Sequence, residues 1–289
     1  MPHLLLVVLF AAAPPPPPPA GATPEVVSPF GEKFYAEADT KGNVAKAETE
    51  LAADPKNVDL LIKLGRAYVG VWRLRDAVAT FSKAIALQPD KGLLYRLRGH
   101  RYITMRRFDD AEKDLERATT LPGDKPFDYW YHLGLAHYLK GRYDKAAPAY
   151  EKALAAASTD DNRVAASDWL YMTYRRAKRD ADARKVLEKI TPDMKIKEDT
   201  AYFARLLFYK GLKKDTDLRE EDHADAKKAT LWYGVGNFYL CQGDVEKAKL
   251  YFNRTIATRE WQAFAYIASE RELLRLKARP ASATAAAAK

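Results

Sequence analysis

The sequence LGRAY at residues 64–68 returns as RGHRY at residues 98–102 and as LGLAH at residues 133–137. The copies follow one another with a period of about 34 residues, which is typical of a stack of small helical units. An alanine lies twelve residues beyond each glycine, followed at fixed spacing by a bulky apolar residue and a second alanine. These residues are Ala77, Phe81 and Ala84, then Ala111, Leu115 and Ala118, then Ala146, Tyr150 and Ala153.

Each copy predicts two helices, because its apolar residues recur at spacings of three and four. In the first copy, one helix carries Leu61, Leu64, Gly65 and Tyr68, and the second carries Ala77, Phe81 and Ala84 before Pro89 ends it. Small residues at Gly65 and Ala77 leave room for the two helices to cross closely. The sequence therefore predicts an all-α solenoid of antiparallel helix pairs.

This pattern resembles the tetratricopeptide repeat (TPR) family, and the resemblance covers residues 57–256. The third copy matches it through Trp130, Leu133, Gly134, Ala146, Tyr150 and Ala153, and a later copy through Trp232, Gly236, Tyr239, Gly243, Ala248 and Phe252. The resemblance implies about five repeats that present a surface to a protein or peptide. It carries little information about which ligand is bound.

The fourth and fifth repeats are expected to be degenerate. The fourth keeps its register through Leu170, Tyr174, Ala183, Leu187 and Ile190, but Tyr171 stands where the pattern has glycine. Residues 202–211 predict a first helix, and residues 212–226 a charged, irregular insertion. Residues 43–55 predict the second half of a repeat, within an N-terminal linker and partial-repeat helix at 23–56. The solenoid is predicted to span residues 57–277. Its last helix, at 261–277, is predicted to be a cap with Glu270 and Lys277 on its polar side. Residues 278–289 are predicted to be a disordered tail.

Residues 1–22 predict a cleaved signal peptide. An apolar run at Leu4–Ala13 is too short to span a bilayer, and six prolines follow it at Pro14–Pro19. Ala20-Gly21-Ala22 fits a signal-peptidase site, which makes Thr23 the first mature residue. An exported protein, periplasmic or secreted, of the bacterial type is the expectation. The alternative is an apolar, proline-rich leader on a cytoplasmic protein, because no Lys or Arg precedes the run.

The chain is basic, with a net charge of +9 and a pI near 9.3. Such a charge attracts acidic partners without specifying them. An intracellular basic repeat protein that associates with nucleic acid or acidic proteins is therefore a second hypothesis. The single cysteine, Cys241, excludes an intramolecular disulfide, so the fold depends on packing.

The sequence predicts no catalytic residue, cofactor or metal site. His132 and His137 are five residues apart, so their side chains diverge by about 140° on a helix, whereas two ligands of one zinc ion should face together. Phosphate-binding loops, nucleophile elbows and Cys–His pairings do not occur in the sequence.

The candidate peptide-binding groove follows from the resemblance, which implies that ligands lie along the first helices of the pairs. The positions implied are Arg66, Arg96, His100, Tyr131, His132, Tyr138 and Arg175. Their mixture of cations and aromatic rings suits a peptide with acidic, or acidic and apolar, side chains. Some family members clamp a C-terminal carboxylate, but the matching positions here include Asp128, which would repel it.

Two further arginines stand at unusual positions of the second copy. The pattern expects leucine at Arg98 and a small residue at Arg101. A cation at a packed position must find an anion, and Asp110 and Asp114 are the candidates. The alternative is that these arginines hold an acidic partner.

Overall fold

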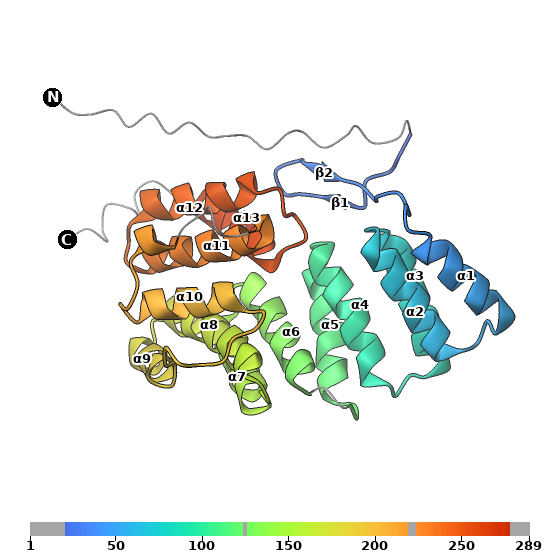
Figure 1. Cartoon of the computed structure of the whole chain (residues 1–289), viewed down its shortest axis with the longest axis horizontal. Coiled ribbons are helices and arrows are strands. Elements are labelled where there is room, and N and C mark those ends of the chain that lie inside the picture. The colour runs from blue at the N-terminus through green and yellow to red at the C-terminus, as the bar shows by residue number, and fades with distance from the viewer. Residues whose placement is uncertain (1–20, 124–125, 219–223, 278–289) are drawn as a thin grey trace.

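The computed structural model describes residues 21–123, 126–218 and 224–277, which form thirteen α-helices, one short 3-10 helix and one antiparallel hairpin (Figure 1). Five helix pairs dominate. Their first helices are α2 (Val58–Gly70), α4 (Gly92–Thr104), α6 (Pro126–Leu139), α8 (Asp160–Arg176) and α11 (Asp225–Cys241). Their second helices are α3 (Leu74–Leu87), α5 (Phe108–Thr119), α7 (Tyr143–Ala155), α9 (Asp180–Glu188) and α12 (Val245–Ala257). The predicted solenoid of helix pairs is confirmed.

The remaining elements lie at the ends and at the irregular region of the array. They are β1 (Val26–Val27), β2 (Lys33–Phe34), α1 (Asn43–Ala53), α10 (Thr200–Tyr209), the 3-10 helix η1 (Asp215–Asp217) and α13 (Phe264–Lys277). None of the helices in the described ranges combines the length and the apolar character needed to cross a bilayer.

Close approach of the paired helices explains the repeated glycine. A Cβ atom on Gly65 would lie 2.3 Å from Cε1 of Phe81, the bulky residue of the second helix. Gly134 has the same relation to Tyr150, where the distance would be 2.9 Å. The glycine therefore makes room for the aromatic ring of the facing helix as well as for the helix crossing.

The turn between the two helices of each pair contains a residue with positive φ. Trp72, Arg106 and Lys178 adopt φ values of 56°, 61° and 59°, and Gly141 and Gly243 adopt 77° and 85°. A left-handed conformation costs a residue with a Cβ atom roughly 1–2 kcal/mol. Three of the five turns therefore carry strain that glycine would remove.

The irregular region begins at Tyr171, the residue that replaces glycine. Its ring stacks on Tyr209 of α10, with the ring centroids 4.4 Å apart. Helix α10 is followed by η1 instead of by a long second helix, and α11 begins at Asp225. The predicted degenerate repeat and irregular insertion are confirmed within the described residues.

Helix α13 differs from the predicted cap in two ways. It begins at Phe264 rather than at Trp261. Glu270, expected on a polar outer side, is 1% exposed and pairs with Arg106 at 3.0 Å, so that expectation was wrong. The reason is that α13 packs against α6 as well as α11 and α12, so more than one of its sides is covered.

The N-terminal hairpin joins the first helix pair to the last helices, a contact that the expected linker did not predict. Phe34 stacks on Trp261 with the ring centroids 4.9 Å apart, and Tyr266 donates a hydrogen bond to Glu32 at 3.0 Å. Val26, Phe34, Leu74 of α3 and Tyr266 of α13 share one buried apolar cluster. The predicted signal peptide, apart from residues 21 and 22, and the predicted tail lie outside the described residues.

Candidate functional site

Three residues of the predicted groove are buried by the chain itself. Tyr131, His132 and Tyr138, all on α6, are at most 7% exposed. The hydroxyl of Tyr131 lies 3.3 Å from that of Tyr202 on α10, and the ring of His132 lies against Phe264 of α13. The later helices therefore cover this part of the first-helix face.

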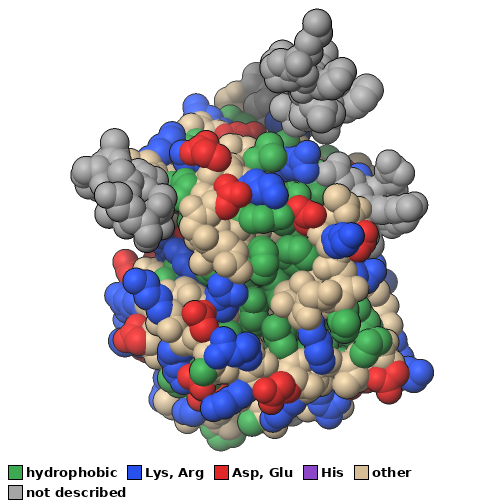
Figure 2. Space-filling model, turned by 90° about the vertical axis from the view of Figure 1, so that its left-hand side faces the viewer, with side chains coloured by type: hydrophobic (Ala, Val, Ile, Leu, Met, Phe, Trp, Pro, Cys, Tyr) green, Lys and Arg blue, Asp and Glu red, His purple; other side chains and the backbone are tan. Residues whose placement is uncertain are grey.

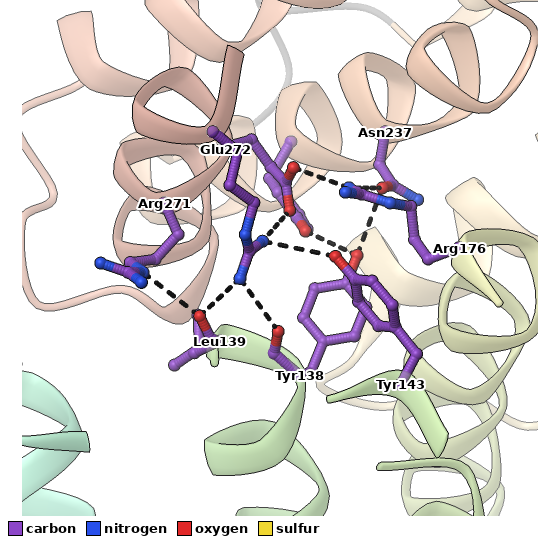
Figure 3. A network of polar contacts seen from close by, with 9 residues as sticks. Tyr138, Leu139, Tyr143, Arg176, Asn237, Arg271 and Glu272 are labelled. Atoms are coloured by element: carbon purple, nitrogen blue, oxygen red, sulfur yellow. Dashed lines mark hydrogen bonds and ion pairs between the residues drawn. The ribbon is translucent and has the colours of Figure 1, made fainter. Parts of the chain in front are cut away.

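Tyr138 belongs to a polar network between α6 and α11 (Figure 3). Its hydroxyl donates to Oδ1 of Asn237 at 3.2 Å and accepts from the hydroxyl of Tyr233 at 2.8 Å. Burial raises the pKa of Tyr138 well above its ordinary value, so the hydroxyl stays protonated. The Tyr138 hydroxyl therefore makes both of these hydrogen bonds to other residues of the protein.

Helix α13 caps the C-terminal end of α6 in the same network (Figure 3). Arg275 and Arg271 donate to the carbonyl oxygen of Leu139 at 2.7 and 3.2 Å. Cations stabilise the carbonyl end of a helix, where the partial charge is negative. Arg176 of α8 pairs with Glu272 of α13 at 2.7 Å, so α13 connects the third and fourth helix pairs.

Arg175 is also occupied by neighbouring side chains. It pairs with Asp180 at 2.8 Å and donates to the hydroxyl of Tyr171 at 3.0 Å. The other three predicted groove residues are Arg66 on α2 and Arg96 and His100 on α4, and Phe264 of α13 contacts the ring of His100.

Arg66 forms the open part of the first-helix face, and Arg96 is largely buried. Arg66 is exposed, and no described residue pairs with it. Arg96 pairs with Asp128 at 3.1 Å, while its buried Nε has no hydrogen-bond partner. Burial lowers the pKa of Arg96, and the nearby charge of Arg66 lowers it further against the opposing effect of Asp128.

The two unusual arginines of α4 have different environments. Arg98 forms two hydrogen bonds with Asp114, at 2.7 and 2.8 Å, which confirms the predicted pairing. Asp110 pairs with Arg107 instead. Arg101 is 8% exposed and has no hydrogen bond or ion pair with any described residue, so for Arg101 the expectation of an anion within the chain was wrong.

We call Arg96, His100, Arg101 and His132 the cationic cluster. The two histidine rings lie 4.6 Å apart between their centroids. Burial, with a contribution from Arg96, lowers the pKa of Arg101 to about 10. Burial lowers the pKa of His132 to about 3 and that of His100 well below its ordinary value, and the arginines act in the same direction. At neutral pH the histidines are uncharged and the arginines hold the positive charge.

One group of side chains has the spacing of a metal site. The ligand atoms of Glu112, Glu116 and His137 lie within 4.8 Å of one another. Glu112, however, forms ion pairs with Lys140 and with Arg142, the latter at 2.6 Å. These cations neutralise the carboxylate that a metal ion would need, so the group fits an ion-pair network better than a metal site.

Two clefts lie elsewhere on the described part of the chain. A basic cleft of about 320 Å³ has Arg106, Arg107, Lys140, Arg142 and Arg271 in its wall, and each of them has a partner. A cleft of about 480 Å³ between the hairpin, α12 and α13 is lined by four apolar side chains and four polar or charged ones; the apolar ones are Phe30, Ile256, Leu273 and Leu276.

Comparisons with known proteins agree with the helix pairs. Residues 96–161 match the family model described as tetratricopeptide repeat. The Hsp70-Hsp90 organizing protein of Triticum aestivum is 38% identical over 91 residues, which are 32% of this chain and 16% of that protein. Small glutamine-rich tetratricopeptide repeat-containing protein 2 of Saccharomyces cerevisiae is 28% identical over 117 residues, 40% of this chain and 32% of that protein.

The chain thus spans less than a third of the length of either relative. Among solved structures, MamA is similar with a TM-score of 0.46 and 24% identity, over 61% of this chain and 87% of that one.

Proposed function

We propose that this chain, whose residues 96–161 match the tetratricopeptide repeat family model, is a non-catalytic scaffold in the cell envelope that binds a protein or peptide. The ligand is an extended segment with acidic, or acidic and apolar, side chains. It lies along the first helices α2 and α4, because α10, α11 and α13 cover the corresponding face of α6.

The exposed, unpaired Arg66 beside Arg96 is the observation that supports this proposal. An arginine side chain can form two parallel hydrogen bonds to a carboxylate, which gives both energy and orientation. No carboxylate of α2 or α4 forms an ion pair with Arg66. An acidic residue of a ligand can therefore pair with it without displacing an internal partner.

Capture of the partner tests the binding. The purified chain and an Arg66→Glu variant are compared as baits in an envelope extract, with Arg184→Glu on the exposed side of α9 as the matched control. We expect a partner that the wild-type and control baits retain and the Arg66→Glu bait loses. Retention by a folded Arg66→Glu variant would contradict the proposed surface.

The envelope location is supported by the leader sequence and has a separate test. N-terminal sequencing of the native protein should find Thr23 as the first residue. Recovery of a soluble cytosolic form that still begins with Met1 would contradict export.

Association with nucleic acid is the alternative function that the net charge of +9 suggests. The side of the molecule at left in Figure 1 shows Asp and Glu interspersed with Lys and Arg around a hydrophobic strip (Figure 2). This face is therefore not a uniformly basic surface of the kind that follows a phosphate backbone. Binding to DNA or RNA at low salt that weakens steeply as salt rises would favour the alternative.

A further inference from the structure

Two arginines of the described chain are buried, and Arg101 differs from the other one, Arg205, which pairs with Asp168. The partly buried arginines also pair with carboxylates: Arg98 with Asp114, Arg106 with Glu270 and Arg176 with Glu272. Burying an ion without a partner costs several kcal/mol. A position where the repeat pattern has a small residue thus holds a cation at a cost to stability.

The guanidinium group of Arg101 has no hydrogen bond or ion pair with any described residue, and the residue keeps 8% of its surface exposed. The neighbouring Nε of Arg96 is fully shielded and has no hydrogen bond. A ligand atom that reaches Arg101 would therefore meet a donor that has no competing partner within the described residues.

The surroundings of Arg101 add positive potential. The first residue of α13, Phe264, contacts the rings of His100 and His132, so the N-terminal end of this helix lies at the cluster. The first turn of α13 contains no acidic residue, and the N-terminal end of a helix attracts anions.

Within the cationic cluster itself, one of the two arginine charges is offset by Asp128. Asp128 accepts a hydrogen bond from Arg96 at 3.1 Å. Arg101 retains its charge at neutral pH, and the two histidines are uncharged. One monoanion would therefore offset the charge of Arg101.

We propose that the cationic cluster binds one oxyanion, the side-chain carboxylate of an acidic residue in the bound peptide. The inference depends on the proposed function and adds a subsite to it: Arg66 and Arg96 lie along the face of α2 and α4, and Arg101 receives the carboxylate. Its planar guanidinium can hold both oxygens at once.

Fluorescence anisotropy with a labelled hexaglutamate peptide tests the subsite at low ionic strength, with hexaglutamine as the neutral control. The variants are Arg101→Met, which keeps much of the volume and removes the charge, and Arg184→Met as a matched loss of one exposed arginine. We expect Arg101→Met to weaken hexaglutamate binding at least tenfold and Arg184→Met to change it less than twofold. Hexaglutamine should not bind.

Inorganic phosphate serves as a competitor that distinguishes a site for peptide carboxylates from a site for oxyanions in general. Displacement of the peptide by phosphate, with the same dependence on Arg101, supports a site that recognises oxyanions in general. Hexaglutamate binding that is unchanged in a folded Arg101→Met variant overturns the proposal.

A stability measurement distinguishes a binding arginine from a structural one. Without ligand, Arg101→Met should unfold at a higher temperature than the wild type, because an unpaired buried charge is removed. A lower unfolding temperature together with unchanged anion binding would show that Arg101 only supports the fold. If Arg66→Glu loses the captured partner while Arg101→Met keeps it and hexaglutamate, the proposed function survives and this subsite does not.

Discussion

Asp168 of α8 and Arg205 of α10 form an ion pair of 2.7 Å, and neither side chain is exposed to solvent. Burial raises the pKa of Asp168 to about 7, although Arg205 opposes this shift. For Arg205 the balance is reversed: burial opposes its charge, but Asp168, Tyr209 and Tyr202 together raise its pKa. The guanidinium also donates to the carbonyl oxygen of Thr230 at 2.9 Å, so the pair fixes α10 between α8 and α11.

Replacing Arg205 with methionine should destabilise the protein in a pH-dependent way. The substitution removes the cation that lowers the pKa of Asp168, so that pKa rises further above the value of about 3.9 in the unfolded chain. Because the wild-type carboxyl is itself protonated below about pH 7, the loss relative to wild type should stay constant from pH 5 to pH 7 and grow above pH 7, so that it is ~1 kcal/mol larger at pH 8 than at pH 5. Urea unfolding followed by circular dichroism at both pH values measures it.

The double variant Asp168→Asn with Arg205→Met is the control for this effect. It has no carboxyl group to titrate, so its stability relative to wild type should not fall as the Arg205→Met variant does. An equal loss for Arg205→Met at pH 5 and pH 8 would contradict the explanation.

Gly234 of α11 is required by the same ion pair. A Cβ atom there would lie 2.0 Å from Nε of Arg205, whose side chain is fully buried. We expect Gly234→Ala to destabilise by ~1–3 kcal/mol. Gly70→Ala, where a Cβ atom meets nothing within 4 Å, is the matched control and should be neutral or stabilising by up to ~1 kcal/mol. Thermal unfolding of both variants tests the difference in sign.

Phe34 of the hairpin should contribute more to stability than its neighbour Phe30. Phe34 is buried against Trp261 and Tyr266, whereas Phe30 is 41% exposed. Removal of a buried phenylalanine side chain costs ~3–5 kcal/mol, so Phe34→Ala should lower the midpoint of urea unfolding far more than Phe30→Ala. Similar midpoints for the two variants would mean that the hairpin does not hold α13.

Lys178→Gly should stabilise the turn between α8 and α9. Lys178 has a φ of 59° and no ion pair with a described residue. Relief of the left-handed strain is worth ~1–2 kcal/mol, and the greater freedom of glycine in the unfolded chain offsets roughly half of it. Lys189→Gly, outside the left-handed region, should destabilise by up to ~1 kcal/mol in the same assay.

Cys241 should react slowly while the protein is folded. Burial raises the pKa of its thiol to about 11, so little thiolate is present near pH 8. We expect labelling by a disulfide reagent at pH 8 to be about 100-fold slower in the native protein than in the urea-unfolded chain. Rapid labelling without denaturant would show that the C-terminal end of α11 opens readily.

The sequence predicted the helix pairs because each of them depends on local spacing and on contacts within one repeat. The glycine at position 65 and the ring at position 81 are only sixteen residues apart and belong to the same copy. The burial of Tyr138 could not be predicted in this way, since it depends on Asn237 and Tyr233, far along the chain.

The arginines of α4 show the same limit. The repeat pattern correctly indicated that Arg98 and Arg101 stand at packed positions where a cation is unusual. Only the three-dimensional arrangement shows that Asp114 reaches the first and no described carboxylate reaches the second.

The hairpin has a consequence for how this protein can evolve. Arrays of repeats gain and lose copies easily when each unit contacts only its neighbours. Here one segment must reach Leu74 in the first pair and Trp261 next to the last helix at the same time. Inserting or deleting a copy would change the distance between Leu74 and Trp261, so the hairpin could no longer contact both. The contact of the hairpin with both ends of the array therefore fixes the number of copies.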